Sequence, residues 1–179
     1  MNINKKVGLD PLVNMRTKIL ILGTLPGDKS LKCKEYYADT KNHFWDIVFR
    51  ILDENWSIDK LVHEEIPYEQ RCNFLLDHGI GLWDILEKAY RTNSSDSTIS
   101  EQAFNDLPNF LSQNNNIEFL FFNGQKAFDY CNKQFPQTLA SFRNEILNST
   151  SSRNTTNVFV IIKQWKKAIK NSIPRIKLT

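Results

Sequence analysis

Two short apolar runs stand out in the pattern of hydrophobic and polar positions. Residues 17–23 read TKILILG and residues 117–124 read IEFLFFNG, and each run ends at a glycine. Continuous apolar runs of this length are typical of strands that are buried on both faces of a parallel sheet. The second run leads into QKAFDYCNKQF, whose apolar residues have helical spacing, so the pattern predicts a strand, a glycine turn and a helix.

Helical periodicity fills much of the remaining chain. The segment NHFWDIVFRIL (42–52) has Phe44, Ile47, Val48 and Ile51 on one face, and Asn42 is predicted to cap its start. Further predicted elements are, in chain order, a strand or a helix at 79–86, an amphipathic segment at 99–113, a strand at 143–150 and a last helix from about 154 to 171.

The alternation of strands with helices predicts the fold class. It indicates a short, mainly parallel central sheet with helices on both faces, which is a three-layer α/β/α arrangement. We read the polar stretch 91–100 as a surface loop and expect residues 1–179 to form one domain. Loops at the carboxyl ends of parallel strands share one rim, where ligands of such folds bind. The loops expected there are 23–27 (GTLPG), 122–124 (FNG) and 148–154 (NSTSSRN).

Composition sets limits on the function without choosing one. The 179 residues are 41% hydrophobic, 12% aromatic and 24% charged, as in an ordinary globular domain, and a net charge of +3 permits an anionic partner without requiring one. Three separated cysteines and three separated histidines form no metal-ligand motif, so we expect no metal or other cofactor. No window approaches the roughly 18 apolar residues of a membrane span, and the N-terminus has no secretory apolar core. We therefore expect a cytoplasmic protein that acts as a monomer, away from membranes.

The three rim loops each have a structural and a functional interpretation. Loop 23–27 is either a tight turn or a ligand loop, and it lacks the endings that bind nucleoside triphosphates or NAD. Asn123 could stop a strand, but its amide also offers the donor and the acceptor needed to recognise an oxo-base, with Gly124 allowing close approach. The hydroxyl-rich segment 147–157 could cap the last helix or bind phosphate. Tyr37 precedes its helix and could stack on a base.

Together and in this order, the motifs resemble those of the uracil-DNA glycosylase superfamily. The resemblance is strongest to its hypoxanthine (deoxyinosine) DNA glycosylase branch, with the mismatch-specific uracil glycosylases beside it. It covers residues 17–165. It rests on G-x-x-P-G, SLKCKEYYADTKNHFW, GIGLWDIL with RTNSSDS, FNG and LNSTSSRN.

The resemblance implies a function and a set of site residues. It implies a monofunctional glycosylase of base excision repair, which flips hypoxanthine or uracil out of DNA and hydrolyses the N-glycosidic bond. Asn42 would direct water at C1′, Tyr37 would stack on the extruded base, and Asn123 would hydrogen-bond the leaving base beside Leu25 and Gly124. The sugar and the phosphates would contact Gly23, Thr24, Pro26, Gly27, Ser149, Thr150, Ser151 and Arg153.

The chain also departs from the family pattern. Leu25 stands where mismatch-specific relatives have a catalytic Asn, so the resemblance moves that role to Asn42. Asn148, Ser152 and Arg153 replace Pro, Pro and Ala in the last motif, which puts DNA affinity and catalytic efficiency in question.

Several alternatives stay open from the sequence. The chain could be a nucleic-acid-binding module of the same fold without activity, or a hydrolase of free nucleosides. Hypoxanthine and uracil are not separated, because both present a carbonyl beside an N–H. We interpret Asp84, Arg91 and Asp96 as parts of a buried helix start and a surface turn, and not as catalytic groups.

Overall fold

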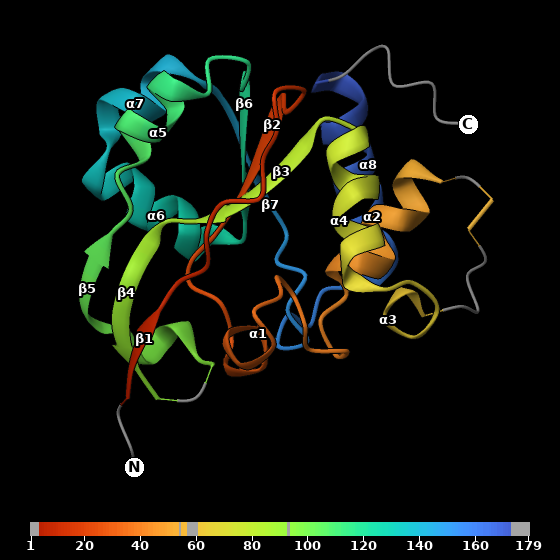
Figure 1. The fold of residues 1–179 in the computed structure, drawn as a ribbon, viewed down its shortest axis with the longest axis horizontal. Helices are drawn as coiled ribbons and strands as arrows, with labels where there is room; N and C mark the ends of the chain where they lie inside the picture. Colours follow the sequence, from red (N-terminus) through yellow and green to blue (C-terminus); the bar gives the residue numbers. More distant parts are fainter. Residues whose placement is uncertain (1–3, 54, 57–60, 93, 173–179) are drawn as a thin grey trace.

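A four-stranded parallel sheet forms the centre of the molecule (Figure 1). The computed structural model describes residues 4–53, 55–56, 61–92 and 94–172. The strand order is β3-β2-β6-β7. The strands are β2 (Ile19–Gly23), β3 (Ile80–Asp84), β6 (Phe119–Asn123) and β7 (Arg143–Leu147). The three strands predicted at 17–23, 117–124 and 143–150 are confirmed, and the strand reading of 79–86 is correct.

Helices cover both faces of this sheet, which confirms the three-layer α/β/α fold class. Ile19 and Ile21 of β2 pack into one core, whereas Leu20 and Leu22 pack into the other, as expected for side chains that alternate along a strand. The first core contains α2 (Phe44–Leu52), α4 (Tyr68–Asp77) and α8 (Val158–Ser172). The second contains α5 (Leu107–Gln113), α6 (Gln125–Gln134) and α7 (Pro136–Ser141).

A second, antiparallel sheet was not anticipated from the sequence. Its order is β1-β4-β5, built from β1 (Asn4–Val7), β4 (Leu86–Arg91) and β5 (Ser100–Phe104). The single amphipathic segment predicted at 99–113 is therefore wrong as one element, because its first part pairs with β4 and its second part forms α5. Asp106 separates the two by capping α5, since its carboxylate accepts a hydrogen bond from the Asn109 backbone N–H.

The remaining elements are short. They are α1 (Asp28–Cys33), α3 (Val62–Glu65) and the 3-10 turn η1 (Asp96–Thr98). The last helix begins at Val158 and not at 154, because the side chains of Asn154 and Asn157 accept hydrogen bonds from backbone N–H groups two residues ahead and form turns. No helix among the described residues is both long and apolar enough to cross a bilayer.

Candidate functional site

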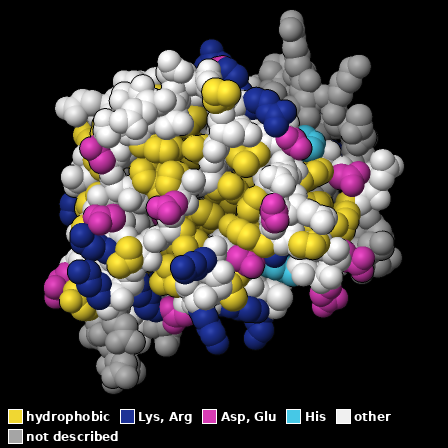
Figure 2. Space-filling view, viewed as in Figure 1, with side chains coloured by type: hydrophobic (Ala, Val, Ile, Leu, Met, Phe, Trp, Pro, Cys, Tyr) yellow, Lys and Arg dark blue, Asp and Glu magenta, His cyan; other side chains and the backbone are white. Residues whose placement is uncertain are grey.

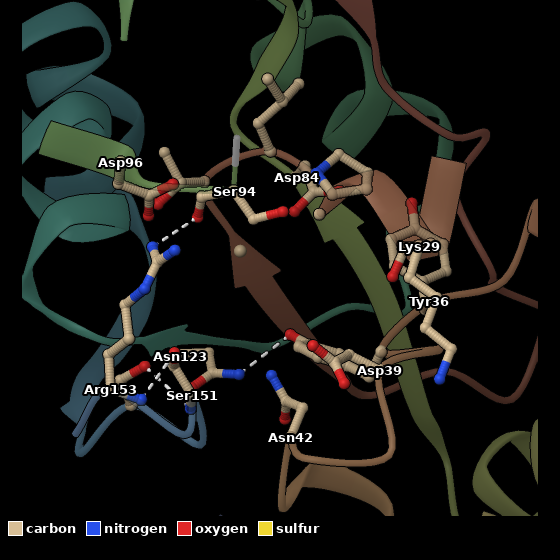
Figure 3. A pocket seen from close by; sticks show the side chains of 18 of the residues that line it. Lys29, Tyr36, Asp39, Asn42, Asp84, Ser94, Asp96, Asn123, Ser151 and Arg153 are labelled. Carbon is tan, nitrogen blue, oxygen red and sulfur yellow. Dashed lines mark hydrogen bonds between the residues drawn. The ribbon is translucent and has the colours of Figure 1, made fainter. Parts of the chain in front are cut away.

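A cavity of about 190 Å³ opens at the carboxyl ends of β2, β3 and β6 (Figure 3). All three predicted rim loops contribute to it, because the carboxyl ends of parallel strands lie at the same edge of the sheet. The residues that line it are Gly23 to Gly27, Lys29, Ser30, Tyr36, Tyr37, Asp39, Asn42, Asp84, Arg91, Ser94, Asp96, Asn123, Ser149, Ser151, Ser152 and Arg153.

The Asn42 side chain is held in a single orientation at the start of α2. Its Oδ1 accepts hydrogen bonds from the Phe44 backbone N–H at 2.9 Å and from the Thr150 hydroxyl at 2.9 Å. Because a backbone N–H can only donate, the amide oxygen must face it. The amide nitrogen of Asn42 consequently points toward the cavity (Figure 3). The prediction that Asn42 caps this helix is wrong by one residue, because His43 is the N-cap of α2 and Asn42 instead bonds the N–H of the first helical residue, Phe44.

Asn123, at the end of β6, links Asn42 to the aromatic part of the site. Its Nδ2 donates to the Tyr37 hydroxyl at 3.0 Å and to the Thr150 hydroxyl at 2.9 Å, while its Oδ1 accepts from the Thr150 backbone N–H at 2.9 Å. The Tyr37 ring stacks on Phe44 with 3.9 Å between ring centroids, so one face of the ring is already covered. Burial, and secondarily the charge of Asp84, raise the pKa of the Tyr37 hydroxyl and keep it protonated.

Thr150 has a different environment from that expected of a phosphate ligand. Its side chain is fully buried, and its hydroxyl bridges Asn123 and Asn42. Its backbone carbonyl also accepts from the His43 backbone N–H at 3.0 Å. We therefore revise its role from phosphate contact to support of the two asparagines.

The other residues of the last motif lie nearer the surface. Ser149, Ser151 and Arg153 line the cavity, and the Arg153 guanidinium donates to the Ser94 carbonyl at 2.8 Å across its mouth (Figure 3). Gly124 has φ +103°, and a Cβ there would lie 3.1 Å from the Ser149 Cβ. Glycine at this position therefore serves the turn and the close approach of the last motif.

Loop 23–27 is held in place by a buried arginine. Arg91 donates to the carbonyl oxygens of Leu25 and Pro26 and to the Asp96 carboxylate. The Leu25 side chain belongs to the second hydrophobic core, although the residue also lines the cavity. Arg91 is thus a structural part of the site and not a surface-turn residue, which corrects our sequence interpretation.

Asp84 ends β3 on the opposite side of the cavity from Asn42 and Asn123 (Figure 3). It belongs to a strand, so the interpretation as a helix start is wrong. Gly23 is its register partner, and a Cβ at Gly23 would overlap the Asp84 carboxyl oxygen. Burial first, and then the charge of Asp96, raise the pKa of Asp84 from 3.8 to about 7, against a lowering by Arg91. The sequence signal for this cluster is that GLWD, which contains Asp84, stands a few residues before RTNSSD, which contains Arg91 and Asp96.

Within the described ranges, no cluster of three or more His, Cys, Asp or Glu side chains is placed to hold a metal ion. The chemistry of the cavity rests on amide, hydroxyl and carboxyl groups, with basic side chains at its edge. Lys29, Lys32 and Lys34 are exposed on and beside α1, and basic side chains are visible on the lower edge of the molecule (Figure 2).

The chain is similar to known proteins along most of its length. The family model described as "Uracil DNA glycosylase superfamily" matches residues 11–171. A hypoxanthine DNA glycosylase of Methanosarcina barkeri is 30% identical over 166 residues, covering 93% of this chain and 99% of the relative. A hypoxanthine DNA glycosylase of Methanosarcina acetivorans is 33% identical over 125 residues, covering 70% of this chain and 75% of the relative. The solution NMR structure of a candidate uracil DNA glycosylase from Methanosarcina acetivorans has a TM-score of 0.76 and 26% identity, over 94% of this chain and 98% of that one.

Proposed function

The chain belongs to the uracil DNA glycosylase superfamily, and we propose that it removes a deaminated base, hypoxanthine or uracil, from DNA by hydrolysing the N-glycosidic bond. It would do so without a bound cofactor, as a monofunctional enzyme of base excision repair. Its similarity to two hypoxanthine DNA glycosylases favours hypoxanthine as the first base to test.

The observation that carries this proposal is the fixed amide of Asn42. With its oxygen occupied by the Phe44 N–H and the Thr150 hydroxyl, its NH₂ group faces the cavity. The Asn42 amide N–H can donate a hydrogen bond to one lone pair of a water oxygen, and the other lone pair of that oxygen stays free to attack C1′. Cleavage through an oxocarbenium-like state needs such a positioned water more than it needs a pair of carboxylates.

Asn123 and Tyr37 would recognise the flipped base. The Asn123 oxygen accepts one hydrogen bond from Thr150, and a carbonyl oxygen has a second lone pair for the N–H of an oxo-base. The Tyr37 hydroxyl accepts from Asn123, which holds the ring in place for stacking. Because Phe44 covers one face of the Tyr37 ring, the base would stack on the other.

The nucleotide backbone would lie along the mouth of the cavity. The backbone of loop 23–27 would contact the sugar, and Ser149, Ser151 and Arg153 would contact phosphates. Arg153 would exchange its hydrogen bond with the Ser94 carbonyl for a charge-assisted one with phosphate. The exposed lysines of α1 add positive charge beside this path.

Alkali-revealed strand cleavage tests the proposal. Labelled duplexes with one hypoxanthine or one uracil are incubated with wild type, with Asn42→Ala, and with the control Asn115→Ala, which changes an exposed Asn outside the cavity. We expect cleavage by wild type and by the control, and a rate about 100-fold or more lower for Asn42→Ala. Borohydride is expected to trap no covalent complex, as befits a monofunctional enzyme.

Each alternative has its own outcome in the same experiment. DNA binding without cleavage of either base would favour an inactive binding module. Release of the base from free deoxyinosine, but not from duplex DNA, would favour a nucleoside hydrolase. Both results would contradict the proposal.

A further inference from the structure

The Asp84 carboxyl group is buried in the cavity wall with an incomplete set of partners. The residue is 6% exposed, and its Oδ2 has no hydrogen-bond partner within the described part of the chain. Buried polar atoms are nearly always satisfied, so an unpaired carboxyl oxygen enclosed in the wall of a cavity favours the protonated acid. Asp84 also lines the same cavity as Asn42 and Asn123.

The surroundings favour the neutral acid over the carboxylate. Arg91 is the cation that lowers the pKa of Asp84. Its guanidinium also donates to the carbonyls of Leu25 and Pro26 and to the Asp96 carboxylate. The other titratable groups that face Asp84 are Asp96, Tyr36 and Tyr37, and none of them brings positive charge. Burial accordingly raises the pKa of Asp84 to about 7, so near neutral pH a large share of the molecules carry the proton.

The position of Asp84 fits a role at the departing base. It lies across the cavity from Asn42 and Asn123 (Figure 3), and its carboxyl group occupies the space beside Gly23. A base that presents one edge to Asn123 therefore turns another toward Asp84. We propose that Asp84 is a further catalytic residue of the reaction proposed above, on which this inference rests, and that it donates a proton to the departing base as a general acid.

The step balances without any further reactant. The oxygen of water bonds to C1′, and the C1′–N bond breaks with its electron pair left on the base. The proton of Asp84 moves to the base, which leaves as a neutral molecule. The attacking water loses its proton to solvent, and the Asp84 carboxylate regains one from solvent. The net reaction is nucleotide plus water to abasic site plus base.

The first test is the pH dependence of single-turnover cleavage. Wild type, Asp84→Asn and the control Asp77→Asn, which removes an exposed carboxylate paired with Arg16, are compared from about pH 5 to about pH 9 on the base that wild type removes. We expect the rate of wild type and control to fall as the pH rises through about 7. Asp84→Asn should be about 100-fold slower below that pH and nearly independent of pH.

The second test separates acid catalysis from a structural role. On one preparation, cleavage rates are compared for a base and its better-leaving analogue, hypoxanthine with 8-azahypoxanthine or uracil with 5-fluorouracil. A general acid matters most for the poorer leaving group, so Asp84→Asn should change this rate ratio about tenfold or more in favour of the analogue. The ratio does not depend on how much of the variant is folded.

The outcomes that overturn the inference differ from those that overturn the proposed function. Suppose that wild type cleaves and Asn42→Ala does not. An unchanged cleavage rate in Asp84→Asn, or an unchanged rate ratio between the base and its analogue, would then refute the role of Asp84 alone. If the wild-type cleavage rate rises with pH and Asp84→Asn abolishes this rise, Asp84 acts as a general base, which would also refute its role as a general acid. Wild type that binds duplex DNA but cleaves no substrate would overturn the proposed function, and the role of Asp84 with it.

Discussion

The two sides of the cavity satisfy their polar groups in opposite ways. On the asparagine wall (Asn42, Asn123, Thr150 and Tyr37), each side chain is joined to another by hydrogen bonds of 2.9 to 3.0 Å. On the aspartate wall (Asp84 with loop 23–27 and its support Arg91), the loop is tied down but the Asp84 Oδ2 has no partner among the described residues.

This difference suggests a division of labour between rigid positioning and proton chemistry. A connected network of amides fixes the direction of each donor before a substrate binds, which lowers the entropy cost of reaction. An unsatisfied buried carboxyl group, by contrast, changes its protonation easily when its surroundings change. Changes to the asparagine wall should therefore alter rates at every pH, and changes to Asp84 should alter the response to pH.

The largest effect on stability is expected from Asp84→Asn at alkaline pH. The pKa of Asp84 is raised in the folded state, so the unfolded chain loses its proton first as the pH rises from about 4 to about 7. Wild type should lose stability over this range relative to the variant, which mimics the neutral acid. One unit of pKa is worth about 1.4 kcal/mol, so the difference at pH 8 should reach at most about 4 kcal/mol.

Denaturant unfolding at about pH 4 and about pH 8 measures this difference. The two proteins should be nearly equally stable at the lower pH, and the variant should be the more stable at the higher one. Asp77→Asn should show no such divergence. Parallel pH curves for wild type and Asp84→Asn would mean that the carboxyl ionises as it does in the unfolded chain.

The next largest effect is expected from Thr150→Val, which breaks the asparagine wall. The substitution keeps the shape but deprives the Asn42 oxygen of a donor and the Asn123 nitrogen of an acceptor. We expect a loss of about 1–3 kcal/mol in the free energy of unfolding. We also expect a cleavage rate about 10-fold to 100-fold lower at every pH, because the asparagines lose their support.

Thr150→Ser supplies the matched control, since it retains the hydroxyl. Thermal unfolding and single-turnover cleavage of both variants check the prediction. If serine fails as badly as valine, the methyl group and not the bridge between the asparagines would be the important part of Thr150.

The layers of the fold could be predicted from the sequence because they depend on local patterns. Buried strands such as residues 117–124 and the amphipathic α2 carry their periodicity in adjacent residues. The antiparallel sheet could not be predicted in this way. Its β5 has exposed and half-buried residues, and its pairing with β4 depends on contacts distant in sequence.

The candidate site also has features that local sequence patterns predict and features that they do not. The rim loops could be grouped because parallel strands deliver their carboxyl ends to one edge. What local patterns could not reveal is how Thr150 is buried between two asparagines or how Arg91 reaches the carbonyls of loop 23–27. The raised pKa of Asp84 likewise comes from burial by several segments, which no motif records.

A smaller effect is expected from Gly124→Ala, behind the asparagine wall. Alanine at φ +103° is strained, and its Cβ would press on the Ser149 Cβ at 3.1 Å. We expect a loss of about 1–2 kcal/mol in the free energy of unfolding. The pH at which the cleavage rate falls should stay that of wild type, because the aspartate wall is untouched. Combining it with Ser149→Gly should recover the part of the loss due to the contact, and full recovery would rule out backbone strain as a cause.

The smallest effect is expected from Lys32→Ala, which touches neither wall. Lys32 is exposed near the end of α1, and its charge would act on the DNA backbone only at short range. We expect DNA binding to weaken a few-fold and the slope of log affinity against log salt to fall by about one. The single-turnover rate at saturating enzyme should remain that of wild type. Lys133→Ala, near the end of α6, should change neither quantity, and an equal loss of affinity from it would mean that net charge rather than the position of α1 governs binding.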